Sequence, residues 1–144
     1  MNLHILKNIS SSQKSFFEIA KKISELSTFH RRNIKVGCIV VHGKRIISSG
    51  YNSDKSHPIQ KRYNIYRFSD DTPHTLHAEI SALIPIMHDS TLDFSKLKIF
   101  IYRQKANGSL GSSKPCESCR NFMKDLGIKH LYYTTDEGFC YEEI

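Results

Sequence analysis

Two short clusters of side chains in this sequence are of types that bind metals or transfer protons. The first is His77-Ala78-Glu79, and the second is Pro115-Cys116-Glu117-Ser118-Cys119. A C-x-x-C pair by itself has three interpretations: two zinc ligands, a thioredoxin-like redox pair, or a coincidence. The residues elsewhere in the chain must decide between them.

One histidine and two cysteines together make three zinc ligands. Zinc binds nitrogen and sulfur ligands tetrahedrally, and three protein ligands leave the fourth position to water, as in catalytic sites. Glu79 lies two residues after His77, so its carboxyl group can reach a bound water without being a ligand and can move protons there. A redox pair would leave His77 and Glu79 unexplained. The pattern therefore favours a catalytic zinc site.

The other two cysteines are expected in the core. Cys38 lies in a run of β-branched and apolar residues, and Cys140 lies between Phe139 and Tyr141, where cysteine behaves as a small hydrophobe. Four irregularly spaced cysteines are too few for a disulfide framework.

The chain is expected to alternate helices and strands, with each chemical cluster at the start of a helix. The predicted helices are 11–28, 75–88 and 117–126, with Pro85 shortening the second and Gly127 ending the third. The predicted strands are 35–41, 44–50, 98–103, 128–134 and 139–144, the first two forming a hairpin. Residues 51–75 and 104–114 are predicted to be loops. This order predicts a layered α/β sheet, in which helix N-termini gather on one edge and the two clusters can meet.

Taken together, H-A-E followed by P-C-x-x-C resembles the zinc-dependent cytidine and deoxycytidylate deaminase superfamily. The resemblance extends from about residue 16 to 134 and implies a three-layer α/β/α sheet, to which the turn at 136–138 adds a C-terminal β-hairpin. It implies that His77, Cys116 and Cys119 hold Zn²⁺. Glu79 would then move protons from the zinc-bound water to the base and to the leaving ammonia.

The same resemblance suggests two substrate contacts. Asn52, in the turn after the first hairpin, would contact the substrate, often its sugar, and the backbone amide of Ala78 would contact the base carbonyl. Asn52 also fits an ordinary turn residue.

The predicted loop 51–75 interleaves cations with aromatic rings. Such a mixture suits stacked bases and phosphates, and it also suits a solvated loop with a hydrophobic anchor. The residues concerned are Lys55, His57, Lys61, Arg62, Arg67, Tyr63, Tyr66 and Phe68. His57 and His74 could hold a second zinc, as in some deoxycytidylate deaminases, but without a nearby cysteine pair that site is not predicted.

Two features depart from the family pattern and leave the substrate open. The stretch 103–114 before Pro115 is long and basic, and it could line the rim of the pocket. The C-terminal hairpin is typical of free-cytidine deaminases, yet those usually carry a cysteine where this chain has His77.

Length and composition fit one intracellular domain. The chain has 144 residues, 39% hydrophobic, which corresponds to a single domain over 1–144. The net charge of +7 favours anionic partners. With no apolar run of transmembrane length and no secretory signal, a cytoplasmic protein without membrane association is expected. The resemblance further implies a homo-oligomer.

These observations predict a zinc-dependent hydrolytic deaminase of a cytosine nucleoside or nucleotide, in which zinc-bound hydroxide attacks C4. One alternative is a deaminase that edits bases in single-stranded DNA or RNA. Another is a non-catalytic zinc-binding domain, against which Glu79 argues, since a structural zinc site has no use for it.

Overall fold

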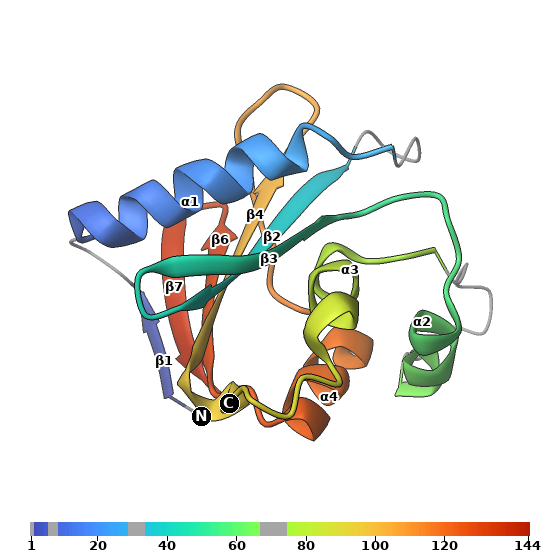
Figure 1. Cartoon of the computed structure of the whole chain (residues 1–144). Helices are drawn as coiled ribbons and strands as arrows, with labels where there is room; N and C mark the ends of the chain where they lie inside the picture. The colour runs from blue at the N-terminus through green and yellow to red at the C-terminus, as the bar shows by residue number, and fades with distance from the viewer. Residues whose placement is uncertain (1, 6–8, 29–33, 67–74) are drawn as a thin grey trace.

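A mixed β-sheet of seven strands forms the centre of the computed structural model, which describes residues 2–5, 9–28, 34–66 and 75–144 (Figure 1). The strand order is β1-β7-β6-β4-β2-β3, and β5 pairs with β4 outside this path. β4 and β6 run parallel, whereas the other pairs described are antiparallel. The strands are β1 (Asn2–Ile5), β2 (Lys35–His42), β3 (Arg45–Tyr51), β4 (Leu97–Gln104), β5 (Leu110–Gly111), β6 (His130–Thr135) and β7 (Gly138–Glu143).

Helices cover both faces of the sheet, which confirms the predicted three-layer α/β/α arrangement. α1 lies across one face, and α3 and α4 cover the other, with α2 packed against α4 (Figure 1). The α-helices are α1 (Ser11–Ser24), α2 (Pro58–Tyr63), α3 (Ala78–Leu83) and α4 (Glu117–Leu126), and the 3-10 helices are η2 (Asn64–Tyr66), η3 (Ile84–Ile86) and η4 (Phe94–Lys96). Within the described ranges, no helix combines the length and apolar character needed to cross a bilayer.

The alternation of β2 divides the core into two layers. Ile39 and Val41 pack in the cluster that contains Phe17 of α1, whereas Cys38 and Val40 pack in the cluster beneath α3 and α4. Successive side chains of a strand point to opposite faces, so a strand buried on both sides is apolar throughout. Cys38 and Cys140 are both buried in the core, as predicted.

Both predicted hairpins are present. β2 pairs with β3 around Gly43, and β6 pairs with β7 at the C-terminal end. α4 has the predicted bounds and ends at Gly127, whose φ of 94° is a left-handed conformation that glycine adopts without steric cost. α4 also makes the crossover between the parallel strands β4 and β6.

The structure differs from the sequence prediction in several segments. α1 stops at Ser24, short of residue 28, and Leu26 beyond it is 57% exposed. α3 begins at Ala78, three residues later than predicted, and it passes into η3 at Ile84, next to Pro85, which was expected to shorten the helix because it lacks the N–H that continues an α-helix. The segment 51–75 is not a loop throughout, since it contains α2 and η2, and β5 interrupts 104–114. β1 was not predicted.

α3 rests directly on β3 at a glycine. A Cβ atom on Gly50 would lie 2.4 Å from the backbone nitrogen of Ala82 and 2.7 Å from the carbonyl oxygen of Ala78. Ser48 on the same strand donates a hydrogen bond to the carbonyl of Ala82. Gly50 therefore fixes how closely the helix that begins after His77 approaches the sheet.

A buried ion pair joins α4 to the C-terminal strand. Arg120 donates to both carboxylate oxygens of Glu142 at 2.7 and 3.1 Å, and the hydroxyl of Tyr133 donates to Oε2 at 2.9 Å. Glu142 is fully buried, and hydrogen bonding from Arg120 lowers its pKa below the usual 4.5. Since Arg120 follows Cys119 directly, the pair fixes the first turn of α4 on the sheet.

We expect Glu142→Gln to lower the free energy of unfolding at pH 7 by about 3 kcal/mol, because it leaves Arg120 without its opposite charge. A carboxyl group with a lowered folded pKa contributes stability above about pH 4.5 that is lost as the pH falls through that folded pKa. The variant should therefore lose less stability than the parent protein as the pH falls below about 4.5, as measured by urea denaturation. The exposed neighbour Glu143→Gln is the matched control. Equal acid sensitivity of Glu142→Gln and the parent would contradict this role.

Candidate active site

His77 is placed by backbone hydrogen bonds on both of its sides. Before it, Ser53 N–H donates to Leu76 O at 3.1 Å, and Leu76 N–H donates to Lys55 O at 2.8 Å. After it, α3 begins with His77 as its extended N-cap residue. The segment that follows β3 therefore fixes the start of α3. The His77-Ala78-Glu79 cluster lies at a helix start, as the sequence predicts.

The two cysteines lie one helical turn apart. Cys116 is the N-cap of α4, and its carbonyl oxygen accepts the N–H of Arg120 at 2.9 Å. Residues three apart on a helix share one face, so the sulfur of Cys119 lies on the same side as that of Cys116. Pro115, directly before them, is buried.

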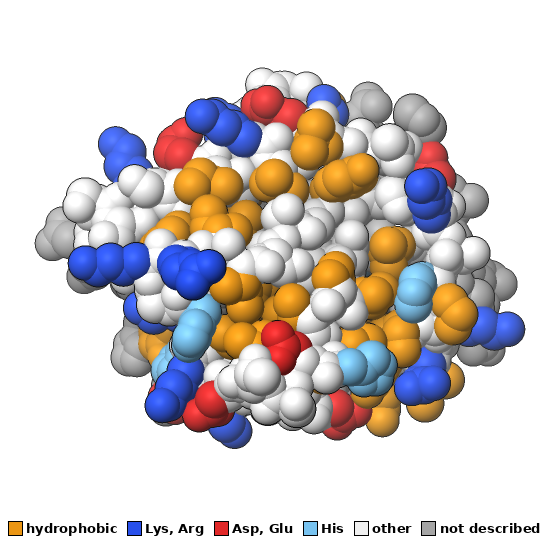
Figure 2. Space-filling view, in the orientation of Figure 1, with side chains coloured by type: hydrophobic (Ala, Val, Ile, Leu, Met, Phe, Trp, Pro, Cys, Tyr) orange, Lys and Arg blue, Asp and Glu red, His pale blue; other side chains and the backbone are white. Residues whose placement is uncertain are grey.

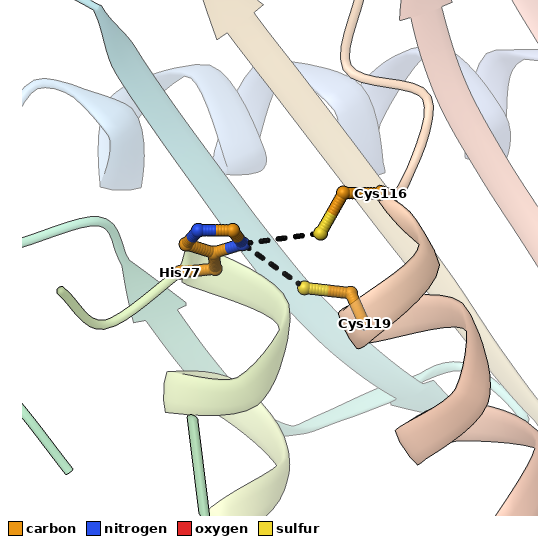
Figure 3. Close-up of side chains that lie close together, drawn as sticks. All are labelled: His77, Cys116 and Cys119. Carbon is orange, nitrogen blue, oxygen red and sulfur yellow. Dashed lines mark hydrogen bonds between the residues drawn. The ribbon is translucent and has the colours of Figure 1, made fainter. Parts of the chain in front are cut away.

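The structure brings these three residues together. Nδ1 of His77 lies 3.3 Å from Sγ of Cys119 and 3.4 Å from Sγ of Cys116 (Figure 3). The three ligand atoms lie within 4.8 Å of one another. Zinc bond lengths of about 2.0 Å to nitrogen and about 2.3 Å to sulfur give a tetrahedral N···S edge of about 3.5 Å, close to the distances found. The geometry therefore fits one zinc ion.

The site is buried on one side and accessible on the other. Cys119 is fully buried, whereas His77 and Cys116 are half-buried. A structural zinc site usually has four protein ligands, and the cluster found within the described residues has three. This arrangement leaves room for a non-protein ligand, which is the property of a catalytic centre.

The electrostatics of the cysteine pair favour metal binding. A hydrogen bond from Cys119, aided by His77, lowers the pKa of the Cys116 thiol to about 3. Burial raises the pKa of Cys119, so the first proton leaves Cys116. The thiolate is the form that binds zinc.

Glu79 lies beside the same cluster. It is 6% exposed on the first turn of α3, and its carboxyl group hydrogen-bonds with Cys119. Burial raises its pKa above 4.5, an effect that His77 opposes. A carboxyl group in such surroundings can hold a proton nearer neutral pH than a solvated one.

The two expected substrate contacts lie in different surroundings. Ala78 is the first residue of α3, so its amide belongs to the helix-start N–H groups that have no acceptor within the helix. Asn52 is buried at the end of β3, where Oδ1 accepts from Val36 N–H at 3.0 Å and Nδ2 donates to Ile34 O at 2.9 Å. The Asn52 side chain thus joins the backbone at the start of β2 to the residue that follows β3.

The predicted loop 51–75 contributes more structure than its sequence indicated. His57 caps α2 by accepting Ile59 N–H on Nδ1 at 3.1 Å, and Pro58 occupies the first helical position. A proline at that position is the signal that could have revealed this short helix. His74, Arg67 and Phe68 lie outside the described residues. Two polar side chains of the new segment, Gln60 and Asn64, are buried next to the site and were not singled out from the sequence.

Comparison with known proteins places the chain in a family. Residues 10–135 match the model described as the cytidine and deoxycytidylate deaminase zinc-binding region. No curated protein sequence matches the chain significantly.

Several solved structures share the fold. The cytidine deaminase from Burkholderia pseudomallei is 18% identical, with a TM-score of 0.63 over 94% of this chain and 93% of the other. The apo dCMP deaminase from the cyanophage S-TIM5 is 24% identical, with a TM-score of 0.57 over 83% of this chain and 79% of the other. At such identities these likenesses show the fold alone. Because the matched family model spans most of the chain and includes all three metal-site residues, this protein belongs to the cytidine and deoxycytidylate deaminase zinc-binding family.

Proposed function

We propose that this protein is a zinc-dependent hydrolytic deaminase of a cytosine nucleoside or nucleotide. The observation that carries the proposal is the convergence of His77, Cys116 and Cys119 beside the buried carboxyl group of Glu79. A hydrolytic metal site needs three protein ligands and a titratable group beside them. A structural site does not need that titratable group.

In this proposal His77, Cys116 and Cys119 hold the zinc through one imidazole nitrogen and two sulfurs. When bound, zinc lowers the pKa of a water molecule and so supplies a nucleophile at neutral pH. The half-buried faces of His77 and Cys116 are the side from which a substrate ring can approach.

Glu79 is assigned the proton transfers. Deamination adds water at C4 of cytosine, breaks the C4–N bond and releases ammonia, so a proton must travel from the attacking water to the ring and then to the leaving amine. The burial that raises the pKa of Glu79 makes its carboxylate a better proton acceptor and its acid form persistent enough to deliver the proton. Ala78 N–H, at the start of the same helix, is assigned the base carbonyl.

We also propose that Asn52 contacts the substrate, in addition to joining the ends of β2 and β3. The side chain of Asn52 hydrogen-bonds the backbone at residues 34 and 36. The backbone carbonyl oxygen of Asn52 accepts a hydrogen bond from Ser27 Oγ at 2.9 Å. The amide group carries one further N–H that a substrate hydroxyl could accept.

A second candidate function is deamination within single-stranded nucleic acid. The observation that favours it is that Lys61 and Arg62 of α2 are exposed on the same segment as Tyr66, which is 45% exposed. Cations next to aromatic rings can bind phosphates and stacked bases. Tyr63, by contrast, packs on Phe122. On the face shown in Figure 2 the described basic side chains are scattered and do not form one continuous patch.

We expect the purified protein to carry one zinc ion per chain and Cys119→Ala to lose most of it on dialysis, because two remaining ligands bind zinc weakly. Elemental analysis by mass spectrometry measures the content. Cys140→Ala, which removes another buried cysteine, is the control and should keep its zinc. Zinc retained in Cys119→Ala, or lost equally in Cys140→Ala, would refute this ligand set.

Glu79→Gln should reduce ammonia release from cytidine, deoxycytidine or their monophosphates by about 10²–10⁴-fold while the zinc content stays unchanged, because the amide cannot transfer the proton. Glu117→Gln, a change of the exposed glutamate between the two cysteines, is the matched control and should stay active. Turnover that survives Glu79→Gln would exclude the assigned mechanism.

If monomers are the substrates, the double variant Lys61→Ala with Arg62→Ala should turn over cytidine as fast as the parent protein. The second candidate predicts instead that the parent binds cytosine-containing oligonucleotides with an affinity that falls steeply with salt and that the double variant loses this binding. Fluorescence anisotropy at several salt concentrations distinguishes the two.

A further inference from the structure

Two polar side chains near the metal site have no role in the chemistry assigned so far. Gln60 of α2 is fully buried, and Asn64 of η2 is 7% exposed. Burying an amide group without hydrogen bonds costs several kcal/mol, so buried amides are found where they have partners. The partners of these two therefore indicate what the segment does.

Gln60 contacts the backbone of the expected histidine ligand. Its Oε1 accepts the N–H of His77 at 3.0 Å, and its Nε2 donates to Oδ1 of Asn64 at 2.8 Å. The N–H of an N-cap residue points away from its own helix and needs an acceptor elsewhere. Gln60 is thus the acceptor that fixes the chain where α3 begins.

Asn64 extends the same hydrogen bonds to the cysteine helix. Its Oδ1 also accepts from Oγ of Ser118 at 3.0 Å. Ser118 is fully buried and lies between Cys116 and Cys119 in the sequence. We call the side chains of Gln60, Asn64 and Ser118 the Gln60 network. It connects the two halves of the metal site, His77 at the start of α3 and the C-x-x-C turn of α4, through α2 and η2.

The segment that carries this network is itself held on α4. The ring of Tyr63 packs on Phe122 with 5.1 Å between centroids, and its hydroxyl donates to Oδ2 of Asp125 at 2.7 Å. Burial and the Asp125 acceptor raise the pKa of Tyr63 to about 12, so the phenol keeps its proton at neutral pH. α2 therefore cannot move away from α4 without breaking the contacts that Tyr63 and Asn64 make with α4.

We infer that Gln60, Asn64 and Ser118 are positioning residues that hold His77 at ligand distance from Cys116 and Cys119 before zinc binds. The inference rests on the proposed ligand roles of those three residues. A preformed site does not have to order two separate helix starts when the metal arrives, so the network should raise metal affinity and define ligand geometry.

The test is the Gln60→Met variant, whose side chain is of similar length but makes no such hydrogen bonds. The matched control is Gln104→Met. Gln104 also donates from Nε2, to Ser24 Oγ at 2.9 Å, but it joins β4 to α1 on the opposite face of the sheet. Zinc affinity is measured by competition with a chromophoric chelator, and cobalt(II) replaces zinc so that its absorption bands report the ligand geometry.

Gln60→Met should bind zinc about tenfold more weakly than the parent protein and show altered cobalt bands, while Gln104→Met matches the parent in both. If Gln60→Met does not fold, Ser118→Ala, which removes one hydrogen bond of the network, should show the same changes to a smaller degree. A Gln60→Met protein that is less heat-stable but has unchanged zinc affinity and cobalt bands would overturn this inference and leave the proposed function standing. A parent protein that binds no zinc through His77, Cys116 and Cys119 would overturn the proposed function with it.

Discussion

The constraint on which this structure depends is that one nitrogen and two sulfurs from distant parts of the chain must lie within 4.8 Å of one another. Each of the three residues lies at the start of a helix, His77 as the N-cap of α3 and Cys116 and Cys119 in the first turn of α4. β4, α4 and β6 form the crossover that places the cysteines, and β3 with its Gly50 contact places α3. The Gln60 network then joins the two helix starts. Most of the features described above serve this one convergence.

Two buried carboxyl groups, Glu142 and Glu79, have opposite pKa shifts and different roles. Glu142 lies against Arg120, whose hydrogen bonds lower its pKa, so it stays charged and holds α4 on the sheet. For Glu79 the largest effect on the pKa is burial, which raises it, and the opposing effect of His77 is smaller. The first arrangement is a fixed structural contact, whereas the second leaves a group that can gain and lose a proton. This contrast, found within one small core, is the electrostatic reason for assigning catalysis to Glu79.

The sequence predicted those parts of the fold that depend on local patterns. Strand alternation and the glycine after Leu126 are local signals, and they indicated the hairpins, β4 and α4 correctly. His77 and the two cysteines could be grouped because their residue types have few other uses together.

β1 was not predicted because four residues at one end of the chain pair with β7 at the other, and no local pattern encodes that pairing. α2 was missed because its buried side, Gln60, is polar, and its hydrogen-bond partners lie on elements remote in the sequence. Asn52 was predicted as a substrate contact from a resemblance, and only the structure shows that its amide also joins two strand ends.

In the proposed function, water replaces the exocyclic amine of a cytosine ring at this site. Its most direct test is to incubate the zinc-loaded protein with cytidine, deoxycytidine and their monophosphates in water enriched in ¹⁸O and to weigh the products by mass spectrometry. We expect a product with a uracil ring that carries one ¹⁸O atom, together with ammonia. Products without the label, or no product from any of these substrates, would contradict it.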